Sequence, residues 1–417
     1  MKLINIKIIK KSEFFQNILK IFSSTGLSQL IQIIGSLYLA KAYVPADFGI
    51  FSLFMSILMF MVVLATLRYE SAIIVEKNDG VVKMIMNTLF VYMLLFSSFL
   101  FLVLLLLPET FLVHFNINEF YLLIPLGTFV YSFYNTLMSY FVRVKRFGLI
   151  AKMKISIAIL IVAFQLLFFY LQIKNGLILG FSLGYFIVSL YMFFVLKQRL
   201  VIQSKKRILL AFSKYFYLVK FGLPTQIIDT VSNAALPVLI VMWFNLEVAG
   251  IYFFAYKMTN LPLQLIGVSI GKVFYQKASH LFNHDKESLR NFVLKIIGLT
   301  SIIVIIPLIL MFFFSKDIIL LVVGEEWAEA GDYISILVIM FFFRTIISAI
   351  SPLADILKKL NVIFIFSIIT FFTYVGAMYV GNIYDDFFLA IKILSISIAL
   401  LYLVQIIYFI NILKYKK

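Results

Sequence analysis

The sequence predicts an all-α polytopic membrane protein, with twelve transmembrane helices in two parallel-repeat, six-helix lobes around a central cavity. Three observations predict this class: the apolar composition, the number of long apolar segments, and a repeat that relates the second half of the chain to the first. Hydrophobic residues make up 63% of the 417 residues and charged residues only 13%. A soluble core does not need that much apolar surface, whereas a bilayer requires it and admits only helices or closed barrels.

Twelve apolar segments are long enough to cross a bilayer as helices, which takes roughly 20 residues each. Continuous apolar runs such as Phe99–Leu107 argue against the alternating pattern of barrel strands. The first six predicted helices span residues 18–42, 47–68, 84–107, 119–141, 152–173 and 176–196. The second six span residues 217–243, 247–271, 292–314, 332–355, 361–381 and 387–412. We therefore expect an N-terminal lobe of residues 1–200 and a C-terminal lobe of residues 201–417.

The positive charges alternate across the predicted membrane and fix its orientation. With the N-terminus placed in the cytoplasm, the outer side receives only four lysines, at Lys41, Lys174, Lys316 and Lys392. Because lysine and arginine concentrate in cytoplasmic loops, both termini are predicted to be cytoplasmic. We attribute the net charge of +17 to this topology and to anionic lipid, and expect no nucleic-acid partner. The absence of cysteine excludes disulfides and thiolate metal sites.

Matching segments in the two halves indicate an internal repeat. Phe48–Phe51 aligns with Ala249–Tyr252 at an offset of 201 residues, and each segment follows an acidic residue in a short outer turn. Val144–Ile150 aligns with Leu357–Ile363 at an offset of 213, which leaves a 12-residue insertion around residues 324–332. Six helices are an even number, so both lobes are predicted to share one orientation about an axis along the membrane normal.

The smaller offset also superposes two polar stripes, one on the first helix and one on the seventh. The first stripe comprises Thr25, Ser28, Gln29, Gln32 and Ser36, and the second Gln226, Asp229, Thr230 and Asn233. Steps of three and four keep each stripe on one helical face. Polar groups at this depth must face protein or water, so we expect the amides at 29, 32, 226 and 233 to contact substrate. Hydrogen bonds that only join helices are the alternative.

Three ionisable residues fall near the predicted midplane, all in the second lobe: Asp229, Lys257 and Arg344. Lys257 lies roughly 15 Å inside the end of its helix at 1.5 Å per residue. A charge at this depth costs roughly 2.5–3.5 kcal/mol, so a role is expected for each. Two further sets share their faces: Asn260 and Gln264 with Lys257, and Ser348, Ser351 and Asp355 with Arg344.

Two interpretations of these charges stay open. In one, Asp229 pairs with Lys257 or Arg344 and only holds the lobe together. In the other, Lys257 and Arg344 bind an anionic head group in a water-filled cavity, with Asn260 and Gln264 as further contacts. Asp229 and Asp355 would then couple transport to Na⁺ or H⁺. Arg68, at the cytoplasmic end of the second helix, would either guide the substrate inward or anchor the topology.

Three segments of the first lobe carry further motifs: Phe22–Gln29, Val44–Phe51, which contains Pro-x-Asp-Phe-Gly, and Leu67–Ala72, which contains Arg-Tyr-Glu. They resemble Wzx-type polysaccharide flippases of the multidrug/oligosaccharidyl-lipid/polysaccharide exporter superfamily. The resemblance implies a flippase of the bacterial cytoplasmic membrane that moves an undecaprenyl-diphosphate-linked oligosaccharide outward for O-antigen or capsule synthesis. It implies alternating access, no enzymatic activity and no cofactor beyond a coupling ion. It also implies bilayer lipids, a polysaccharide polymerase and other assembly proteins as partners.

Two other classes of membrane protein fit the sequence less well. A cation-coupled multidrug antiporter of the same superfamily is the nearest alternative, although carriers of cationic drugs favour buried acids over the two cations found here. A membrane-embedded polymerase or acyltransferase is less favoured, because the longest predicted outer loop, Ser315–Gly331, is short and acidic. No catalytic motif was found, and the three histidines do not suggest one metal site.

Overall fold

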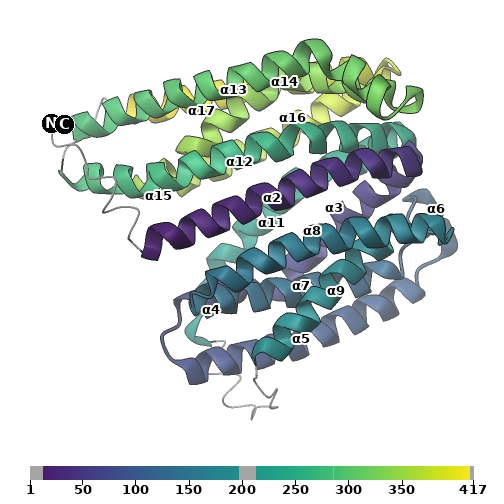
Figure 1. The fold of residues 1–417 in the computed structure, drawn as a ribbon, viewed down its shortest axis with the longest axis horizontal. Coiled ribbons are helices and arrows are strands. Elements are labelled where there is room, and N and C mark those ends of the chain that lie inside the picture. The colour runs from purple at the N-terminus through teal and green to yellow at the C-terminus, as the bar shows by residue number, and fades with distance from the viewer. Residues whose placement is uncertain (1–12, 197–212, 285, 414–417) are drawn as a thin grey trace. The chain divides into compact units, whose positions relative to one another are not determined.

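Long helices make up the described part of the chain, which in this computed structural model covers residues 13–196, 213–284 and 286–413 (Figure 1). Each of the twelve predicted segments holds one of them. In the first half they are α2 (Glu13–Ala42), α3 (Pro45–Thr66), α5 (Asp79–Leu105), α7 (Leu123–Arg143), α8 (Phe147–Tyr170) and α9 (Gly176–Leu196). In the second half they are α11 (Leu223–Trp243), α12 (Leu246–His284), α13 (Lys286–Val322), α14 (Ala328–Ile350), α16 (Leu360–Ile383) and α17 (Phe387–Ile412).

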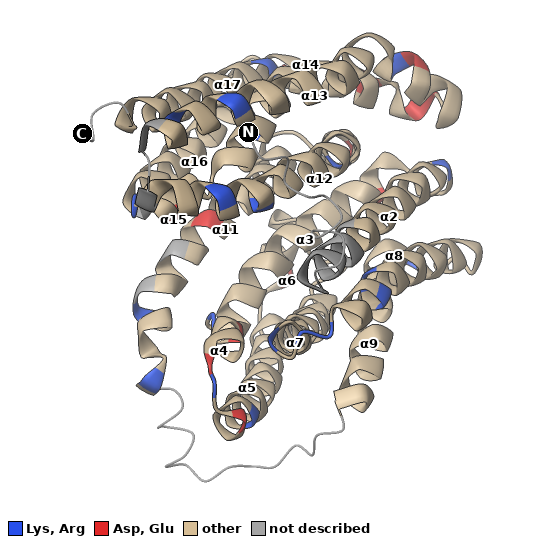
Figure 2. Cartoon of the chain, turned by 60° about the vertical axis from the view of Figure 1, so that its left-hand side comes forward, with Lys and Arg blue, Asp and Glu red and all other residues tan. Residues whose placement is uncertain are grey.

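Shorter helices connect some of these segments. They are α4 (Glu70–Val75), α6 (Glu109–His114), a π-helix at Leu218–Gly222, a 3₁₀ turn at Glu325–Trp327 and α15 (Leu353–Ile356). Lysine, arginine, aspartate and glutamate are sparse on the long helices (Figure 2). Among the described residues, nine helices are long and apolar enough to cross a membrane, by length and composition. The chain is therefore a multi-pass membrane protein, and the count of twelve crossings stays a prediction.

Two predicted boundaries near the outer turn and the end of α14 were wrong. The stretch Ser315–Gly331 is mostly helical, because α13 continues to Val322. Two contacts hold α13 against the start of α14: the Ser315 hydroxyl donates to the Gly331 carbonyl over 2.8 Å, and Lys316 pairs with Asp332 over 2.9 Å. At its other end, α14 stops at Ile350 and not at residue 355; Pro352 has no N–H group to donate to a carbonyl of the preceding turn.

The chain divides into two compact units. Unit 1 comprises Met1–Gly35 and Ile57–Ile227, and unit 2 comprises Ser36–Ser56 and Ile228–Lys417. The C-terminal end of α2 and the N-terminal part of α3 thus group with the second half of the sequence. The predicted lobe boundary after residue 200 and the basic N-terminal residues lie outside the described residues, and both stay predictions.

In unit 1 the hydrophobic core lies where α4, α5, α7, α8 and α9 pack together (Figure 1). The ring of Phe141 and the side chains of Ile85 and Met192 are completely buried there. Small residues let α8 and α9 approach closely, as is common between membrane helices. A Cβ at Gly180 would lie only 2.7 Å from the backbone nitrogen of Gln165.

In unit 2 the core lies among α12, α13, α14 and α17. The outer turn at Pro45 packs onto this unit through Phe48, whose ring centre lies 4.9 Å from that of the buried Trp327 and 6.0 Å from that of Phe254. Such edge-to-face pairs add roughly 0.5–1.5 kcal/mol each beyond the area they bury.

The internal repeat is visible in two reciprocal glycine contacts of unit 2. A Cβ at Gly49 would lie 1.9 Å from the Leu246 carbonyl oxygen, and a Cβ at Gly250 would lie 1.8 Å from the Pro45 carbonyl oxygen. The offset of 201 converts each contact into the other, as a two-fold relation between the repeats requires. The backbone also repeats at the offset of 213. Lys145 and Lys358 have φ of 56° and 55°, and Gln172 and Asp385 have φ of 52° and 51°. These matches confirm both predicted offsets.

Candidate functional site

Arg344, on α14 of unit 2, lies among aromatic side chains. Its guanidinium group donates a hydrogen bond to the hydroxyl of Tyr256 on α12. The guanidinium carbon lies 5.3 Å from the ring centre of Tyr256 and 5.5 Å from that of Phe341. Cation–π contacts of this kind stabilise an arginine that has lost much of its water, by roughly 0.5–2 kcal/mol each. The predicted cost of a charge at this depth is thereby partly offset.

The close approach of α12 and α14 positions this arginine. A Cβ at Gly267 would lie 2.8 Å from the Ser348 hydroxyl oxygen, and one at Gly271 would lie 3.0 Å from the Ser348 carbonyl oxygen. The two glycines are four residues apart, so they lie on one face of α12 and present no side chain to α14. Tyr256 lies eleven residues before Gly267, nearer the start of α12, and its ring reaches across to Arg344.

Two more tyrosines bring an acid into the same cluster. Tyr374 on α16 and Tyr402 on α17 interact electrostatically with Arg344 and also with Asp229 on α11. Tyr374 is buried, Tyr402 is half-buried, and the side chain of Asp229 is exposed. We call Arg344, Tyr256, Tyr374, Tyr402 and Asp229 the Arg344 cluster. It offers a guanidinium group, three hydroxyl groups and one carboxylate, drawn from five helices of unit 2.

Lys257 follows Tyr256 on α12, but it is not part of the described contacts of the cluster. Its side chain is half-buried, and within the described residues it has neither a hydrogen bond nor an ion pair. Successive residues of a helix point about 100° apart, so Lys257 cannot face Arg344 in the way that Tyr256 does. A shared ligand for Lys257 and Arg344 therefore stays a prediction.

The predicted polar stripes divide between the two units. Unit 1 contains Gln29, Gln32 and Gln226, which are all half-buried. The Oε1 atom of Gln29 is buried, with no hydrogen-bond partner among the described residues. Unit 2 contains the exposed Asn233 and Gln264 and the half-buried Asn260. The Asn233 amide donates to the Asp229 carbonyl over 2.7 Å, which supports the backbone of α11. Substrate contacts of all six residues stay predictions.

Asp355 does not share a helix with Arg344, contrary to the sequence-based expectation. It lies on α15, beyond the turn at Pro352, and its side chain is exposed. Pro352, directly before α15, lacks the N–H group that would continue the backbone hydrogen bonds of α14. Its predicted role in ion coupling therefore cannot rest on a shared helical face with Arg344.

Arg68 contacts the segment that precedes α11, within unit 1. Leu67 and Arg68 have φ of 49° and 64°, a left-handed turn that ends α3. The Arg68 Nη1 atom donates to the Gly222 carbonyl oxygen over 2.9 Å. Gly222 is the last residue of the π-helix, and π-helices are frequent at functional positions. The described contact is structural, and a role of Arg68 in guiding substrate stays a prediction.

A second polar network in unit 1 was not predicted from the sequence. The Glu76 carboxylate is almost fully buried, with 4% of the side chain exposed. It accepts hydrogen bonds from the backbone N–H group of Asn78 (2.8 Å), the Lys214 ammonium (2.5 Å) and the Tyr215 hydroxyl (3.0 Å). These donors, led by the Asn78 amide and the Lys214 ammonium, lower the pKa of Glu76 to about 2.

Arg143, at the end of α7, joins the same network. Its guanidinium group donates to the carbonyl oxygens of Glu76 (2.9 Å) and Lys77 (3.0 Å) and pairs with Asp79 over 2.6 Å. The loop between α4 and α5 is therefore tied to α7 and to the segment before α11. The only sequence signal was an acid inside a basic predicted loop, which did not reveal its partners. We call these residues the Glu76 network.

The comparisons with known proteins come from sequence and from structure. A family model described as "Polysaccharide biosynthesis protein" matches residues 38–332. The chain belongs to this family. Membership of the polysaccharide biosynthesis protein family agrees with the flippase resemblance of Phe22–Gln29, Val44–Phe51 and Leu67–Ala72. None of the curated proteins matches the chain.

Solved structures of MOP-superfamily transporters share the fold of this polysaccharide biosynthesis protein. The lipid II flippase MurJ in an inward closed conformation is similar with a TM-score of 0.75 and 14% identity, over 94% of this chain and 87% of that chain. An inward-facing multidrug resistance MATE family transporter is similar with a TM-score of 0.67 and 14% identity, over 95% and 96%. A Pyrococcus furiosus transporter, described as having a binding pocket of reverse polarity, has a TM-score of 0.52 and 11% identity, over 96% of both chains.

Proposed function

We propose that this protein flips an undecaprenyl-diphosphate-linked oligosaccharide from the cytoplasmic to the outer leaflet of the bacterial cytoplasmic membrane, by alternating access. The oligosaccharide would be a repeat unit of O-antigen or capsule. Family membership and the fold shared with a lipid II flippase support this proposal. In it the protein is a transporter and not an enzyme, and a polysaccharide polymerase and other assembly proteins are its partners.

The Arg344 cluster is the observation that carries the proposal. A diphosphate is recognised best by guanidinium groups, which donate two parallel hydrogen bonds to one phosphate. Arg344 uses its Nη1 atom for the Tyr256 hydroxyl and has four further N–H donors for a ligand. The tyrosine hydroxyls around it can donate to phosphate oxygens or to sugar hydroxyls. A guanidinium group at the centre of a site favours an anionic substrate.

The other predicted residues take secondary roles in this proposal. Lys257 supplies a second positive charge, Arg68 guides the substrate inward, and the amides of Gln29, Gln32 and Gln226 contact sugar. Asn233, Asn260 and Gln264 contribute further sugar contacts. Asp229 and Asp355 respond to Na⁺ or H⁺, and no other cofactor is required.

The test compares Arg344→Ala with Arg344→Lys in a strain whose own copy of the gene is deleted. Surface glycan is measured by immunoblotting, and protein level is measured in the same membranes. We expect Arg344→Ala to lower glycan at least tenfold, since charge-assisted hydrogen bonds contribute roughly 1.5–3 kcal/mol. Arg344→Lys should retain part of the activity, because lysine keeps the charge but not the paired donors.

Arg146→Ala is the matched control, since this arginine is exposed at the start of α8 in unit 1. It should leave surface glycan unchanged. Full glycan in Arg344→Ala at normal protein level would contradict the proposal. A specific observation, the exposed carboxylate of Asp229, favours the second candidate, a cation-coupled multidrug antiporter. That function predicts that Asp229→Asn abolishes drug resistance and leaves glycan unchanged.

A further inference from the structure

Unit 2 has an apolar groove between α13, α14 and α17, whose lining includes no residue of the Arg344 cluster. Its volume is about 560 Å³, within the range of sites that hold one small ligand. The residues at its deeper end are Ile305, Phe342 and Ile396, and those at its other end include Phe313, Ser335 and Lys392. We propose that this groove binds one anionic phospholipid, with an acyl chain between the three helices and its phosphate at Lys392.

The direction of the helices gives the groove a polar end and an apolar end. α13 runs antiparallel to α14 and α17, so the late residues of α13 lie level with the early residues of the other two (Figure 1). Lys392 is the sixth residue of α17, roughly 8 Å from its start at 1.5 Å per residue. Ser335 and Phe342 are separated by roughly 10 Å along α14. The predicted topology places the polar end at the outer head groups.

Lys392 is the basic residue that lines the polar end of the groove. Its side chain is exposed, and within the described residues no carboxylate pairs with it. Lys316, near the end of α13, is already paired with Asp332 over 2.9 Å. A lysine at head-group level attracts an anionic lipid, whereas a zwitterionic lipid carries its own cation. One ammonium group suits the single phosphate of a phospholipid better than the diphosphate of a lipid-linked sugar.

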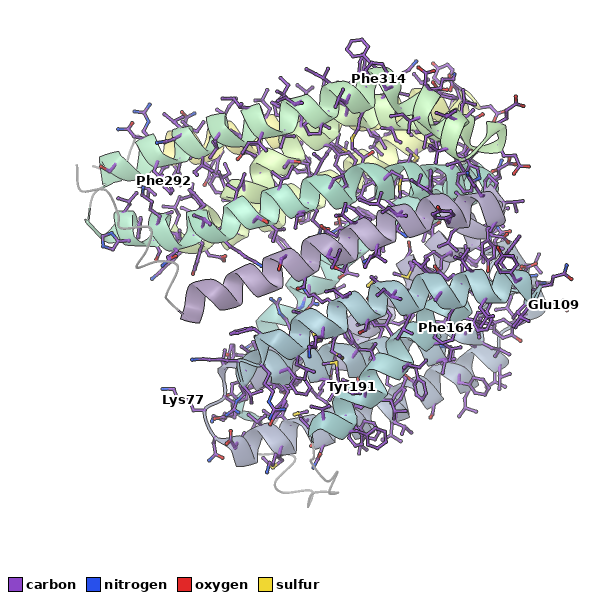
Figure 3. All side chains as sticks on the ribbon, viewed as in Figure 1. Lys77, Glu109, Phe164, Tyr191, Phe292 and Phe314 are labelled. Atoms are coloured by element: carbon purple, nitrogen blue, oxygen red, sulfur yellow. The ribbon has the colours of Figure 1, made fainter. Side chains whose placement is uncertain are left out.

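The walls of the groove fit a hydrocarbon chain. Phe312, Ile309 and Ile339 contribute apolar side chains from two helices, and both serine hydroxyls of the groove donate to backbone carbonyls of α14, at Asp332 and Ile336. The hydroxyl protons are therefore directed to protein and not to the groove. Phe314 on α13 points outward (Figure 3) and is 50% exposed, as expected for a helix that contacts lipid.

The experiment measures lipid binding to the full chain, purified in detergent, by native mass spectrometry. Phosphatidylglycerol and phosphatidylcholine with identical acyl chains are titrated separately. We expect tighter binding of phosphatidylglycerol, and a loss of about fivefold in its affinity in Lys392→Gln. Phosphatidylcholine affinity should not change in that variant. Ile339→Trp, which fills the groove, should weaken the binding of both lipids.

Two controls separate the site from general charge and from misfolding. Lys174→Gln removes another exposed lysine of unit 1, one that pairs with Glu119 over 3.2 Å, and should leave both affinities unchanged. Lys392→Arg should restore phosphatidylglycerol binding, which excludes a folding defect at this position. Equal binding of the two lipids to the wild type, or equal phosphatidylglycerol binding to Lys392→Gln, would overturn the proposal. Tighter binding of undecaprenyl phosphate, with displacement of phosphatidylglycerol, would also overturn it.

Discussion

Glu76→Gln should loosen the segment before α11 from the rest of unit 1. The substitution removes the negative charge that accepts hydrogen bonds from the Asn78 amide, the Lys214 ammonium and the Tyr215 hydroxyl. Hydrogen bonds to a charged group contribute roughly 1.5–3 kcal/mol, and the glutamine amide cannot accept all of them. Because 53% of the Lys214 side chain is exposed, solvent screens that ion pair, and it contributes only a minor part of the loss. The whole substitution should cost about 2 kcal/mol.

A single introduced cysteine can measure this loss, because the chain has none of its own. Val219 lies in the π-helix and packs against the core of unit 1, so a Val219→Cys thiol should react slowly with a maleimide. If the thiol reacts only from a locally opened state, a loss of 2 kcal/mol speeds labelling about 30-fold. A Glu76→Gln and Lys214→Met double-mutant cycle should give a coupling much smaller than the effect of Glu76→Gln alone, because solvent screens the ion pair.

The pH dependence gives an independent check on the same network. A pKa lowered to about 2 from 4.5 means that the stabilisation from Glu76 is fully present above pH 4.5 and is lost as the pH falls toward 2. Labelling of the wild type, corrected for thiol ionisation, should therefore be constant between pH 5 and 8.

Glu109→Gln is the matched control for the substitution at Glu76. Glu109 is exposed, at the opposite end of unit 1 from Lys77 (Figure 3), so labelling should not change. An unchanged rate in Glu76→Gln, or a loss of protection already at pH 6, would refute the assigned role of the carboxylate.

Four further substitutions test the repeat contact, the Glu76 network and the predicted site. Gly49→Ala and Gly250→Ala should each destabilise the protein by at least about 2 kcal/mol in thermal unfolding, because the new methyl groups would meet backbone carbonyls at 1.9 and 1.8 Å. The control is Gly148→Ala, which should have no such effect because nothing lies within 4 Å of the new methyl group. Arg143→Lys should speed labelling of the same cysteine reporter, since lysine cannot reach two carbonyls and a carboxylate together; an unchanged rate would count against its place in the network. Lys257→Met should leave the unfolding midpoint unchanged or higher, because a half-buried ammonium group without a described partner is replaced by an apolar chain; a lower midpoint would reveal a stabilising contact.

The sequence predicted the helices and the repeat better than the contacts of the site. Gly49 and Gly250 were aligned from short motifs, and the structure placed them in reciprocal contact. Arg344 stood out because it is a single charge in an apolar segment. Its partners Tyr256 and Tyr374 did not stand out, since the chain has 23 tyrosines and 47 phenylalanines. The end of α13 was predicted at residue 314, whereas the helix continues to Val322 and its Lys316 is paired with Asp332 on the next helix.

The sequence alone determined where helices form, how many residues each can span, and which segments repeat. These properties are local, because helical hydrogen bonds join residues four apart and a bilayer selects for about 20 apolar residues in a row. Only the tertiary structure decided which polar groups meet. Glu76 and Lys214 are 138 residues apart in the chain, and Arg344 and Tyr256 are 88 apart. Such pairs depend on the packing angle and register of whole helices, for which no short sequence pattern exists.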